Sequence, residues 1–457
     1  FIADSIKCSS VISRKCSQAK KFWKWNDMLA IIIYNLVMVL ISPILLPVIF
    51  LRGYFGEMTR NGVGERMGFI PRRKLKGTKP RIWVHAVSVG ETMAAKFICP
   101  ALQQQFQDFE IFQSSTTDTG HEQATKFMGD TGQVIYFPYD FLLFDWLSLT
   151  RVRPQLLVLV ETELWPNFLL VAKLIGCKII MVNGRISERS IKGGQRFAPM
   201  YRWMTAQVDL FLMQGQVDAE RIIMLGADPS RVRVEGNAKF DQVDSVVSLG
   251  EQLLLRGTLG FNRDEPVLVA GSTHPGEEEI ILRAFRQVKK SVPNVRLLIA
   301  PRQINRAGEI SELIISHGFS PVRRTRLHDK SMSPPPDAVV ILDTIGELAS
   351  AYALCAAAFV GGSLDSTGGH NILEALAPGK PVLFGPNMSN FRDIAQIALD
   401  NEVGFQVVDD TEIAAKWVEI LQSPKILVKI AQKTKEVFQQ QKGASARCAR
   451  AAKDLMS

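Results

Sequence analysis

Several signatures of common enzyme classes are missing from this chain of 457 residues. No G-x-x-x-x-G-K-[ST] segment occurs, and the first predicted strand-to-helix turn, AVSVGE, lacks the G-x-G-x-x-G spacing of dinucleotide-binding turns. The six cysteines include no C-x-x-C pair, and no two of the six histidines stand four residues apart or beside a cysteine. The sequence therefore does not indicate ATP chemistry, hydride transfer or a structural zinc site. We expect a reduced cytoplasmic protein without a metal or a cofactor.

The longest stretch without a charged residue is the apolar run 28–51. Its length matches the ~20 residues needed to cross or enter a bilayer. A secretory signal is the alternative, but the run exceeds the roughly 7–15 residues of a signal's apolar core, and no small-x-small cleavage site follows it. We interpret 28–51 as an uncleaved membrane anchor, and Pro43 and Pro47 leave open whether it spans the bilayer. We expect residues 1–27, which are polar and begin with Phe1, to be an extension outside the fold.

Positive charge is in excess, with a formal net charge of +9. Such a surplus suits nucleic acid, anionic lipid or a phosphorylated small molecule, so it does not choose among them. Basic residues crowd both flanks of the apolar run, which leaves its orientation open. These residues are Lys20, Lys21, Lys24, Arg52, Arg60, Arg66, Arg72, Arg73, Lys74 and Lys76.

From residue 81 onward, short β-rich apolar runs alternate with helical patterns, which predicts parallel sheets covered on both faces. The predicted strands are 81–86, 110–116, 133–138, 155–161, 178–184, 209–214 and 232–237, followed by 266–273, 295–302, 338–343, 357–363 and 381–386. A helical, less patterned stretch separates the two series. We therefore predict two Rossmann-like α/β domains, 52–241 and 263–423, joined by a linker 242–262, with a helical segment 424–457 packing back across the boundary. Tandem domains of this kind form a cleft at the carboxyl ends of their strands.

Carboxylates stand at two strand ends of the first domain. The segment HAVSVGE leads into a helix that begins at about Glu91, and the positive helix end favours the ionised form of that side chain. An ionised carboxylate at a cleft is suited to take a proton from a sugar hydroxyl; a glutamate that only caps the helix is the alternative. The strand in QLLVLVETELWPN ends in Glu161 and Glu163, which share a face if the extended conformation lasts that far. Solvated loop carboxylates are the alternative there.

Two cations follow other strands. GNAKFD places Lys239 after the last strand of the first domain, where a cation can balance a leaving phosphate. Arg302 ends a strand of the second domain and can hold a phosphate or a base edge with its forked donors. A solvated surface residue is the alternative for both.

Glycine pairs mark two loops of the second domain, 361–363 and 368–371. Paired glycines before a helix let backbone N–H groups close around an anion at the positive helix end. Asn371 and Glu374, three residues apart, are then placed to reach the ribose hydroxyls of a nucleotide.

Taken in order, these segments resemble a known family. The segments are HAVSVGE, ETELWPN, NGRIS, GNAKFD, GSTHPGEE, APR, DTIGEL and FVGGS followed by GGHNILE. Over about residues 28–441 the chain is similar to the Kdo (3-deoxy-D-manno-octulosonic acid) transferases of lipopolysaccharide synthesis. GERMGF, after the apolar run, also looks like that family's N-terminus. Ile372 and Asn237 stand where relatives vary.

The resemblance implies a GT-B glycosyltransferase, in which two Rossmann-like domains face a cleft and an N-terminal hydrophobic segment anchors the chain. It implies that Glu91 is the proton acceptor and that Glu161 and Lys239 stabilise the transition state. It also implies a CMP site made by Pro301, Arg302, Ile345, Gly346, Glu347, Asn371, Ile372, Leu373 and Glu374.

The implied reaction moves Kdo from CMP-Kdo to the 6′-hydroxyl of a lipid A precursor, lipid IV-A, with inversion and without a metal. The implied location is the inner membrane, with the catalytic domains on the cytoplasmic face, and no nucleic acid is a partner. Two alternatives stay open: another GT-B transferase acting on a membrane lipid intermediate, and a catalytically inactive protein that binds anionic lipid at the membrane surface.

Overall fold

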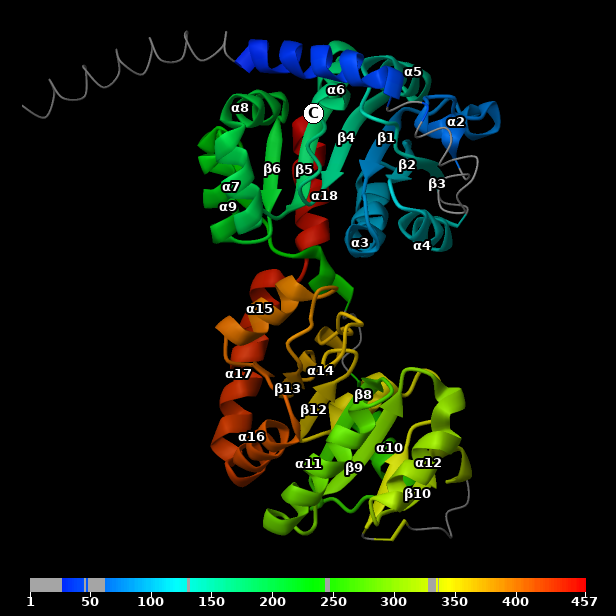
Figure 1. The fold of residues 1–457 in the computed structure, drawn as a ribbon, viewed down its shortest axis with the longest axis vertical. Helices are drawn as coiled ribbons and strands as arrows, with labels where there is room; N and C mark the ends of the chain where they lie inside the picture. Colours follow the sequence, from blue (N-terminus) through cyan, green and yellow to red (C-terminus); the bar gives the residue numbers. More distant parts are fainter. Residues whose placement is uncertain are drawn as a thin grey trace, which may run out of the picture. The chain divides into compact units, whose positions relative to one another are not determined.

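The computed structural model describes residues 27–44, 47, 62–129, 132–242, 247–327, 334–335 and 337–457 (Figure 1). The chain forms two compact units. Unit 1 contains the chain up to Gln242 together with Gln441–Ser457, and unit 2 contains Val243–Gln440. Each unit is built around its own parallel sheet.

Unit 1 contains a seven-stranded parallel sheet in the order β3-β2-β1-β4-β5-β6-β7. The strands are β1 Arg81–His85, β2 Glu110–Ser115, β3 Gly132–Tyr136, β4 Pro154–Val160, β5 Lys178–Gly184, β6 Leu210–Met213 and β7 Val232–Val234. The α-helices are α2 Val63–Arg66, α3 Val89–Gln105, α4 Asp118–Met128, α5 Leu142–Val152, α6 Pro166–Leu174, α7 Glu188–Arg196, α8 Ala198–Gln207, α9 Gln216–Met224 and α18 Ala444–Met456, and the 3-10 turns are η1 Arg72–Leu75, η2 Pro229–Arg231 and η3 Ala238–Gln242.

Both faces of the central part of this sheet are buried because the strands β1, β4 and β5 are mostly apolar on both sides. In β1, Trp83 packs into the core on one face, and Ile82 packs into the core on the other. Helix α3 presents Ile98 and Leu102, one turn apart, to the second core. Helix α18, whose buried residues are mostly alanine, packs against α3 and β5. Small side chains permit this close approach, so the last helix of the chain completes the first unit.

Unit 2 repeats the architecture with a sheet in the order β10-β11-β9-β8-β12-β13-β14, again parallel throughout. Its strands are β8 Val267–Thr273, β9 Arg296–Pro301, β10 Ser320–Arg323, β11 Ala338–Ile341, β12 Ala357–Val360, β13 Val382–Phe384 and β14 Gly404–Gln406. The α-helices are α10 Leu249–Thr258, α11 Glu277–Ser291, α12 Ala307–Ser316, α13 Leu348–Leu354, α14 Leu373–Leu376, α15 Arg392–Asp400, α16 Asp410–Gln422 and α17 Pro424–Gln441, and the 3-10 turns are η4 Ile304–Arg306 and η5 Arg324–Arg326. The predicted α/β class with two Rossmann-like domains is confirmed.

Two details of the predicted organisation differ from the structure. The strands β10 and β14 were not predicted, because SPVR and GFQ at the sheet edges contain no apolar run. The predicted linker 242–262 contains α10, which is capped by reciprocal hydrogen bonds between Ser248 and Glu251 and packs against α13. Because α10 buries Leu255, the segment belongs to unit 2.

One helix in the described part of the chain, Asp27–Ile44, is long and apolar enough to cross a membrane, with a mean hydropathy of 2.1 (dark blue in Figure 1). Ile31 and Tyr34 pack it against the core of unit 1. Residues 1–26, 45–46 and 48–51 of the predicted extension and anchor lie outside the described residues. Most other large apolar side chains of the helix are exposed, namely Met28, Leu29, Ile32, Ile33, Leu36, Val37, Val39, Leu40, Ile41 and Ile44.

Two of the flanking basic residues have structural roles instead of lying free at the surface. Arg66 is buried, donates to the Thr116 carbonyl at 2.7 Å and lies 3.6 Å from Asp118. Lys74 donates to Glu65 at 2.6 Å. Desolvated, paired cations of this kind support the fold and do not reach lipid headgroups. The exposed members of the set are Arg72, Arg73 and Lys76, while Lys20, Lys21, Lys24, Arg52 and Arg60 lie outside the described residues.

Candidate active site

The carboxylates of unit 1 meet at the switch point of its sheet. Successive connections run outward in opposite directions from the neighbouring strands β1 and β4, and open α/β sheets bind ligands beyond the carboxyl ends of such a pair. The loop after β1 leads to Glu91 on α3, and the loop after β4 carries Glu161 and Glu163. Strand pairing therefore brings together acids about 70 residues apart in the sequence.

Glu91 is the third residue of α3, and its carboxylate turns back onto the helix start. The Val87 backbone N–H donates to Oε2 at 2.5 Å, and the Ser88 hydroxyl donates to Oε1 at 3.0 Å. These hydrogen bonds favour the ionised form, but they do not dominate. Burial first, and then the charges of Glu163 and Glu161, raise the pKa of Glu91 to about 8.

This result corrects the expectation that the helix end keeps Glu91 ionised. A helix terminus stabilises a nearby anion by about 0.3–1 kcal/mol when exposed to solvent. Loss of water and two acidic neighbours outweigh that contribution, so the pKa of Glu91 in the unliganded chain is raised instead of lowered. The pKa of Glu163 is raised to about 7, mainly by burial, although the Trp165 indole N–H donates to its Oε2 at 3.0 Å.

The alternation argument for Glu161 and Glu163 is wrong in its geometry. Strand β4 ends at Val160, and Glu161 adopts a left-handed backbone conformation with φ of 62°, so the extended chain stops before both glutamates. The side chain of Glu161 instead accepts a hydrogen bond from Lys239 Nζ at 3.1 Å. Lys239 is buried, so the alternative of a solvated surface lysine is also excluded.

Buried amide side chains hold Lys239 in place, and sequence reasoning missed their contribution. Asn237 accepts from the Lys239 backbone N–H at 2.9 Å and donates to Gln214 at 3.0 Å. Asn183, at a φ of 53°, accepts from the Ala238 N–H at 2.9 Å. Asn183 belongs to NGRIS, which had no assigned chemistry, and Asn237 to GNAKFD, where only Lys239 had an assigned role, so their place in these motifs was the sequence signal.

In unit 2 the predicted donor residues also lie at a switch point, formed by β8 and β12. Arg302 follows β9 directly and is exposed, whereas Pro301 is buried at the strand end. The positive charge of Arg302 lowers the pKa of Glu374 in part, although burial raises that pKa overall. Asn371 lies just before α14 and donates to Glu374 at 3.3 Å. Arg302, Asn371 and Glu374 therefore lie together.

Other members of the predicted CMP set differ in exposure. Ile345 is 86% exposed, and Gly346 has a φ of 91° with open space where a Cβ would stand. Glu347 accepts a hydrogen bond from the Arg324 side chain at 2.8 Å, which holds this turn in place. Ile372 and Leu373, by contrast, are fully buried, so these two residues pack the turn and present no surface to a nucleotide.

The glycine loop of unit 2 already holds an anion, the carboxylate of Glu277. Its oxygens accept from the backbone N–H groups of Gly362, Ser363 and Leu364 at 2.7, 3.0 and 3.1 Å. The Gly369 N–H donates to the Gly362 carbonyl at 2.6 Å. The N–H groups of Gly362, Ser363, Leu364 and Gly369 are therefore occupied by the protein itself, and the expectation of an anion at the helix start after 368–371 stays a prediction.

Two histidines of separate motifs face each other in this loop cluster. Nε2 of His274 and Nε2 of His370 lie 2.8 Å apart, so one ring donates and the other accepts. Burial first, and then the charges of Arg302 and His274, lower the pKa of His370 to about 4. At neutral pH His370 is therefore uncharged.

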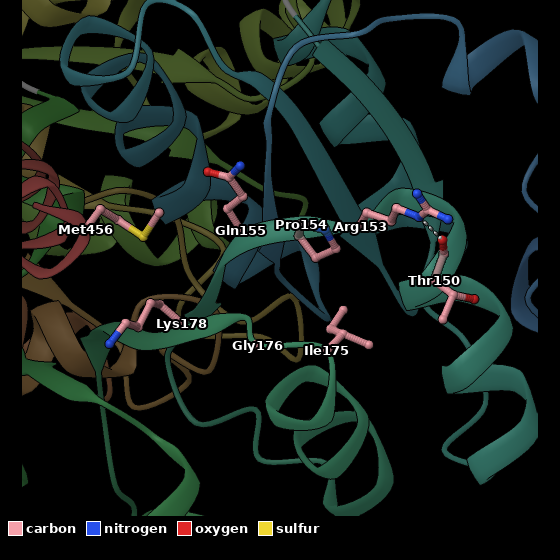
Figure 2. Close-up of a pocket in the computed structure, with 8 residues that line it drawn as sticks. All are labelled: Thr150, Arg153, Pro154, Gln155, Ile175, Gly176, Lys178 and Met456. Atoms are coloured by element: carbon pink, nitrogen blue, oxygen red, sulfur yellow. Dashed lines mark hydrogen bonds between the residues drawn. The ribbon is translucent and has the colours of Figure 1, made fainter.

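A cavity of about 530 Å³ lies elsewhere in unit 1, at the amino ends of β4 and β5 (Figure 2). It is lined by Thr150, Arg153, Pro154, Gln155, Ile175, Gly176, Lys178 and Met456. Arg153 and Lys178 extend in different directions, and Arg153 donates to the Thr150 carbonyl at 3.0 Å. The side chains of Arg153 and Lys178 do not point to a common ligand position. The cavity also lies at the amino ends of the strands, whereas Glu91 lies beyond the carboxyl ends, which remain the better candidate site.

Comparisons with known proteins identify the family to which this chain is similar. Residues 61–242 match the family model of the 3-deoxy-D-manno-octulosonic-acid transferases. A 3-deoxy-D-manno-octulosonic acid transferase of Haemophilus influenzae is 30% identical over 90% of this chain and 95% of its own length. A bifunctional glycosyltransferase/methyltransferase of Fusobacterium nucleatum is 37% identical over 75% of this chain, which spans only about half (53%) of that protein. A glycosyltransferase structure from Rickettsia africae shares the fold, with a TM-score of 0.50 at 13% identity over 83% of this chain and all of that one.

Proposed function

Because the chain belongs to the Kdo transferase family, we propose that it transfers Kdo from CMP-Kdo to the 6′-hydroxyl of a lipid A precursor, lipid IV-A. Unit 1 supplies the base, and unit 2 binds the nucleotide of the donor. The acceptor oxygen forms a bond to the anomeric carbon of Kdo as the bond from that carbon to CMP breaks. Attack from the face opposite CMP inverts the configuration without a covalent enzyme intermediate.

The observation that carries this proposal is the state of Glu91 at the switch point of unit 1. A general base works best when its pKa lies near the working pH, because it is then partly ionised and still a strong proton acceptor. Burial beside Glu163 and Glu161 raises the pKa of Glu91 to about 8, well above that of a solvated glutamate. Perturbations of this size are concentrated at functional sites. Glu91 accepts the proton that the acceptor hydroxyl loses.

Charge on the departing CMP is balanced by the protein's own cations. Arg302 is exposed, and within the described residues no side chain pairs with its guanidinium, so its donors are open to a phosphate. Asn371 and Glu374 beside it suit the ribose hydroxyls, and the exposed Ile345 suits the base. Lys239, paired with Glu161, supplies positive charge near the reacting centre. The proposed reaction needs no metal ion.

The proposal places the chain at the cytoplasmic face of the inner membrane, where a lipid acceptor resides. Its support is the helix Asp27–Ile44, whose outward side chains form a continuous apolar surface. Arg72, Arg73 and Lys76 are exposed nearby in the sequence, and each cation close to anionic lipid contributes about 1 kcal/mol.

The purified full chain, incubated with CMP-Kdo and lipid IV-A in detergent micelles, should release CMP and yield a lipid whose mass increases by one or more Kdo residues. Glu91→Gln should retain CMP binding and lower turnover roughly 10²–10⁴-fold. Stabilisation by UDP but not by CMP in a thermal-shift titration would identify a different GT-B transferase. Lipid binding without any transfer would favour the inactive membrane-surface protein.

A further inference from the structure

Asp140, which none of the sequence motifs includes, caps the helix that follows the catalytic loop. The first N–H groups of a helix have no partner within the helix, and the N-cap residue of α6, Trp165, makes no side-chain capping bond in the described structure. Asp140 supplies the cap from another loop. Its Oδ1 accepts from the Phe168 N–H at 2.9 Å and its Oδ2 from the Asn167 N–H at 3.3 Å. The Asn167 side chain returns a bond to the Asp140 carbonyl at 3.0 Å.

The start of α6 determines where the catalytic carboxylates lie. Trp165 immediately precedes α6, and its indole N–H holds Glu163 at 3.0 Å. The charge of Glu163 contributes to the raised pKa of Glu91. A shift of the first turn of α6 therefore moves Glu163 and changes the basicity of Glu91.

The same Asp140 carboxylate also receives a hydrogen bond from the apolar helix. Tyr34, on Asp27–Ile44, donates its hydroxyl to Asp140 Oδ2 at 2.8 Å. Asp140 is itself buried, so this bond is shielded from water. A second polar contact of that helix, between Asp27 and Arg202 of α8 at 3.3 Å, does not involve Asp140.

We propose that Tyr34 and Asp140 are positioning residues that couple the seating of the apolar helix on unit 1 to the geometry of the loop carrying Glu161 and Glu163. The inference rests on the proposed role of Glu91 and extends it. When the helix is seated, the Tyr34 hydroxyl holds Asp140 against the start of α6. When the helix lifts away, Asp140 loses the Tyr34 donor and keeps those of Asn167, Phe168 and its buried neighbour Asp145, so its hold on the start of α6 is weakened. Transfer is thereby favoured in chains whose apolar helix is in place.

The test compares Tyr34→Phe, which removes one hydroxyl, with Asp140→Asn and with the control Asp27→Asn. We expect kcat to fall about 3- to 10-fold in Tyr34→Phe and about 10- to 100-fold in Asp140→Asn, as expected for loss of one or several hydrogen bonds to a charged cap. KM for CMP-Kdo should change less than about twofold, because the donor residues lie in unit 2. The double variant should match Asp140→Asn alone, because the bond between Tyr34 and Asp140 is already lost in that single variant. Asp27→Asn should leave kcat unchanged.

A second readout needs no turnover. The difference in stability between Glu91→Gln and its parent changes with pH, and the midpoint of that change reports the pKa of Glu91. The midpoint should move when both proteins also carry Tyr34→Phe. Normal kcat and an unmoved midpoint in a folded Tyr34→Phe chain would overturn the coupling. An equal loss of kcat in Asp27→Asn would also overturn it, because any loosening of the helix would then suffice. If the unsubstituted chain transfers no Kdo but the midpoint still moves, the proposed function fails and the coupling stands.

Discussion

Glu91→Gln should stabilise the folded chain in a strongly pH-dependent way. The carboxyl of Glu91 has an ordinary pKa of 4.5, and in the fold burial and two acidic neighbours raise this pKa to about 8. Between these values the folded state keeps a proton that the unfolded state has lost, so stability falls as pH rises. The contribution of the protonated Glu91 is complete below pH 4.5 and is lost progressively up to about pH 8. A glutamine fits the same space and has no charge to bury.

The magnitude follows from the width of that interval. Each pH unit within it costs about 1.4 kcal/mol, so the penalty reaches on the order of 3–5 kcal/mol, part of which is shared with Glu161 and Glu163. In a unit of this size, 1 kcal/mol corresponds to about 2–4 °C in Tm. The Tm of Glu91→Gln should therefore be close to that of the parent at pH 5 and exceed it by at least about 6 °C at pH 9.

Differential scanning calorimetry of the two detergent-solubilised full chains at pH 5, 6, 7, 8 and 9 measures this difference in Tm. Groups that titrate in the same way in both proteins do not contribute to the difference. Glu122→Gln, at an exposed position of α4, is the matched control and should show no trend. Removing the neighbour with Glu163→Gln should shift the rise to lower pH. A difference between Glu91→Gln and its parent that is flat with pH, or that shrinks toward pH 9, would refute the argument that Glu91 is a desolvated acid among acids.

Three further outcomes are expected. Lys239→Met should destabilise unit 1 by about 3 kcal/mol in urea, because it leaves the partly buried Glu161 unpaired, and adding Glu161→Gln should recover most of that loss while transfer stays low. Glu277→Gln should lower stability by about 2 kcal/mol and weaken CMP binding, as measured by calorimetry, because the Glu277 carboxylate accepts hydrogen bonds from the N–H groups of the glycine loop. Unchanged CMP affinity would show that this loop is not part of the donor site. Arg302→Lys should weaken CMP binding roughly tenfold at unchanged Tm, because an exposed lysine keeps the charge but cannot donate two parallel hydrogen bonds to one phosphate. Equal affinity would show that Arg302 does not bind the phosphate.

Much of the fold followed from local pattern. Strands such as RIWVH and QLLVLV are apolar on both faces, and only a parallel sheet with helices on both sides buries such runs. The edge strands SPVR and GFQ carry no such pattern and exist because a neighbouring strand offers them partners. The helical pattern of 242–262 predicts a linker helix, and the structure shows that this helix, α10, buries Leu255 within unit 2.

The site shows the same division. Glu161 stands out because apolar strands do not end in charged residues by propensity, Glu91 because it lies in the first turn of a helix after a strand, and Lys239 because it follows the last strand of the first domain. The raised pKa of Glu91 was beyond local reasoning, since it depends on desolvation and on charges that arrive through the pairing of β1 with β4. The partners of Glu277 and of Asp140 were equally hidden, because the N–H groups they accept lie on other loops.

The sequence by itself determined the strand series, the chemical identity of the acids and cations at the strand ends, and the apolar segment near the start of the described chain. These properties depend on residue type and on spacing along one segment. Only the tertiary structure decided which carboxylate is protonated, which lysine is paired and which glycine N–H groups are occupied. Burial and distance between segments set those states, and the order of residues within any one segment contains neither.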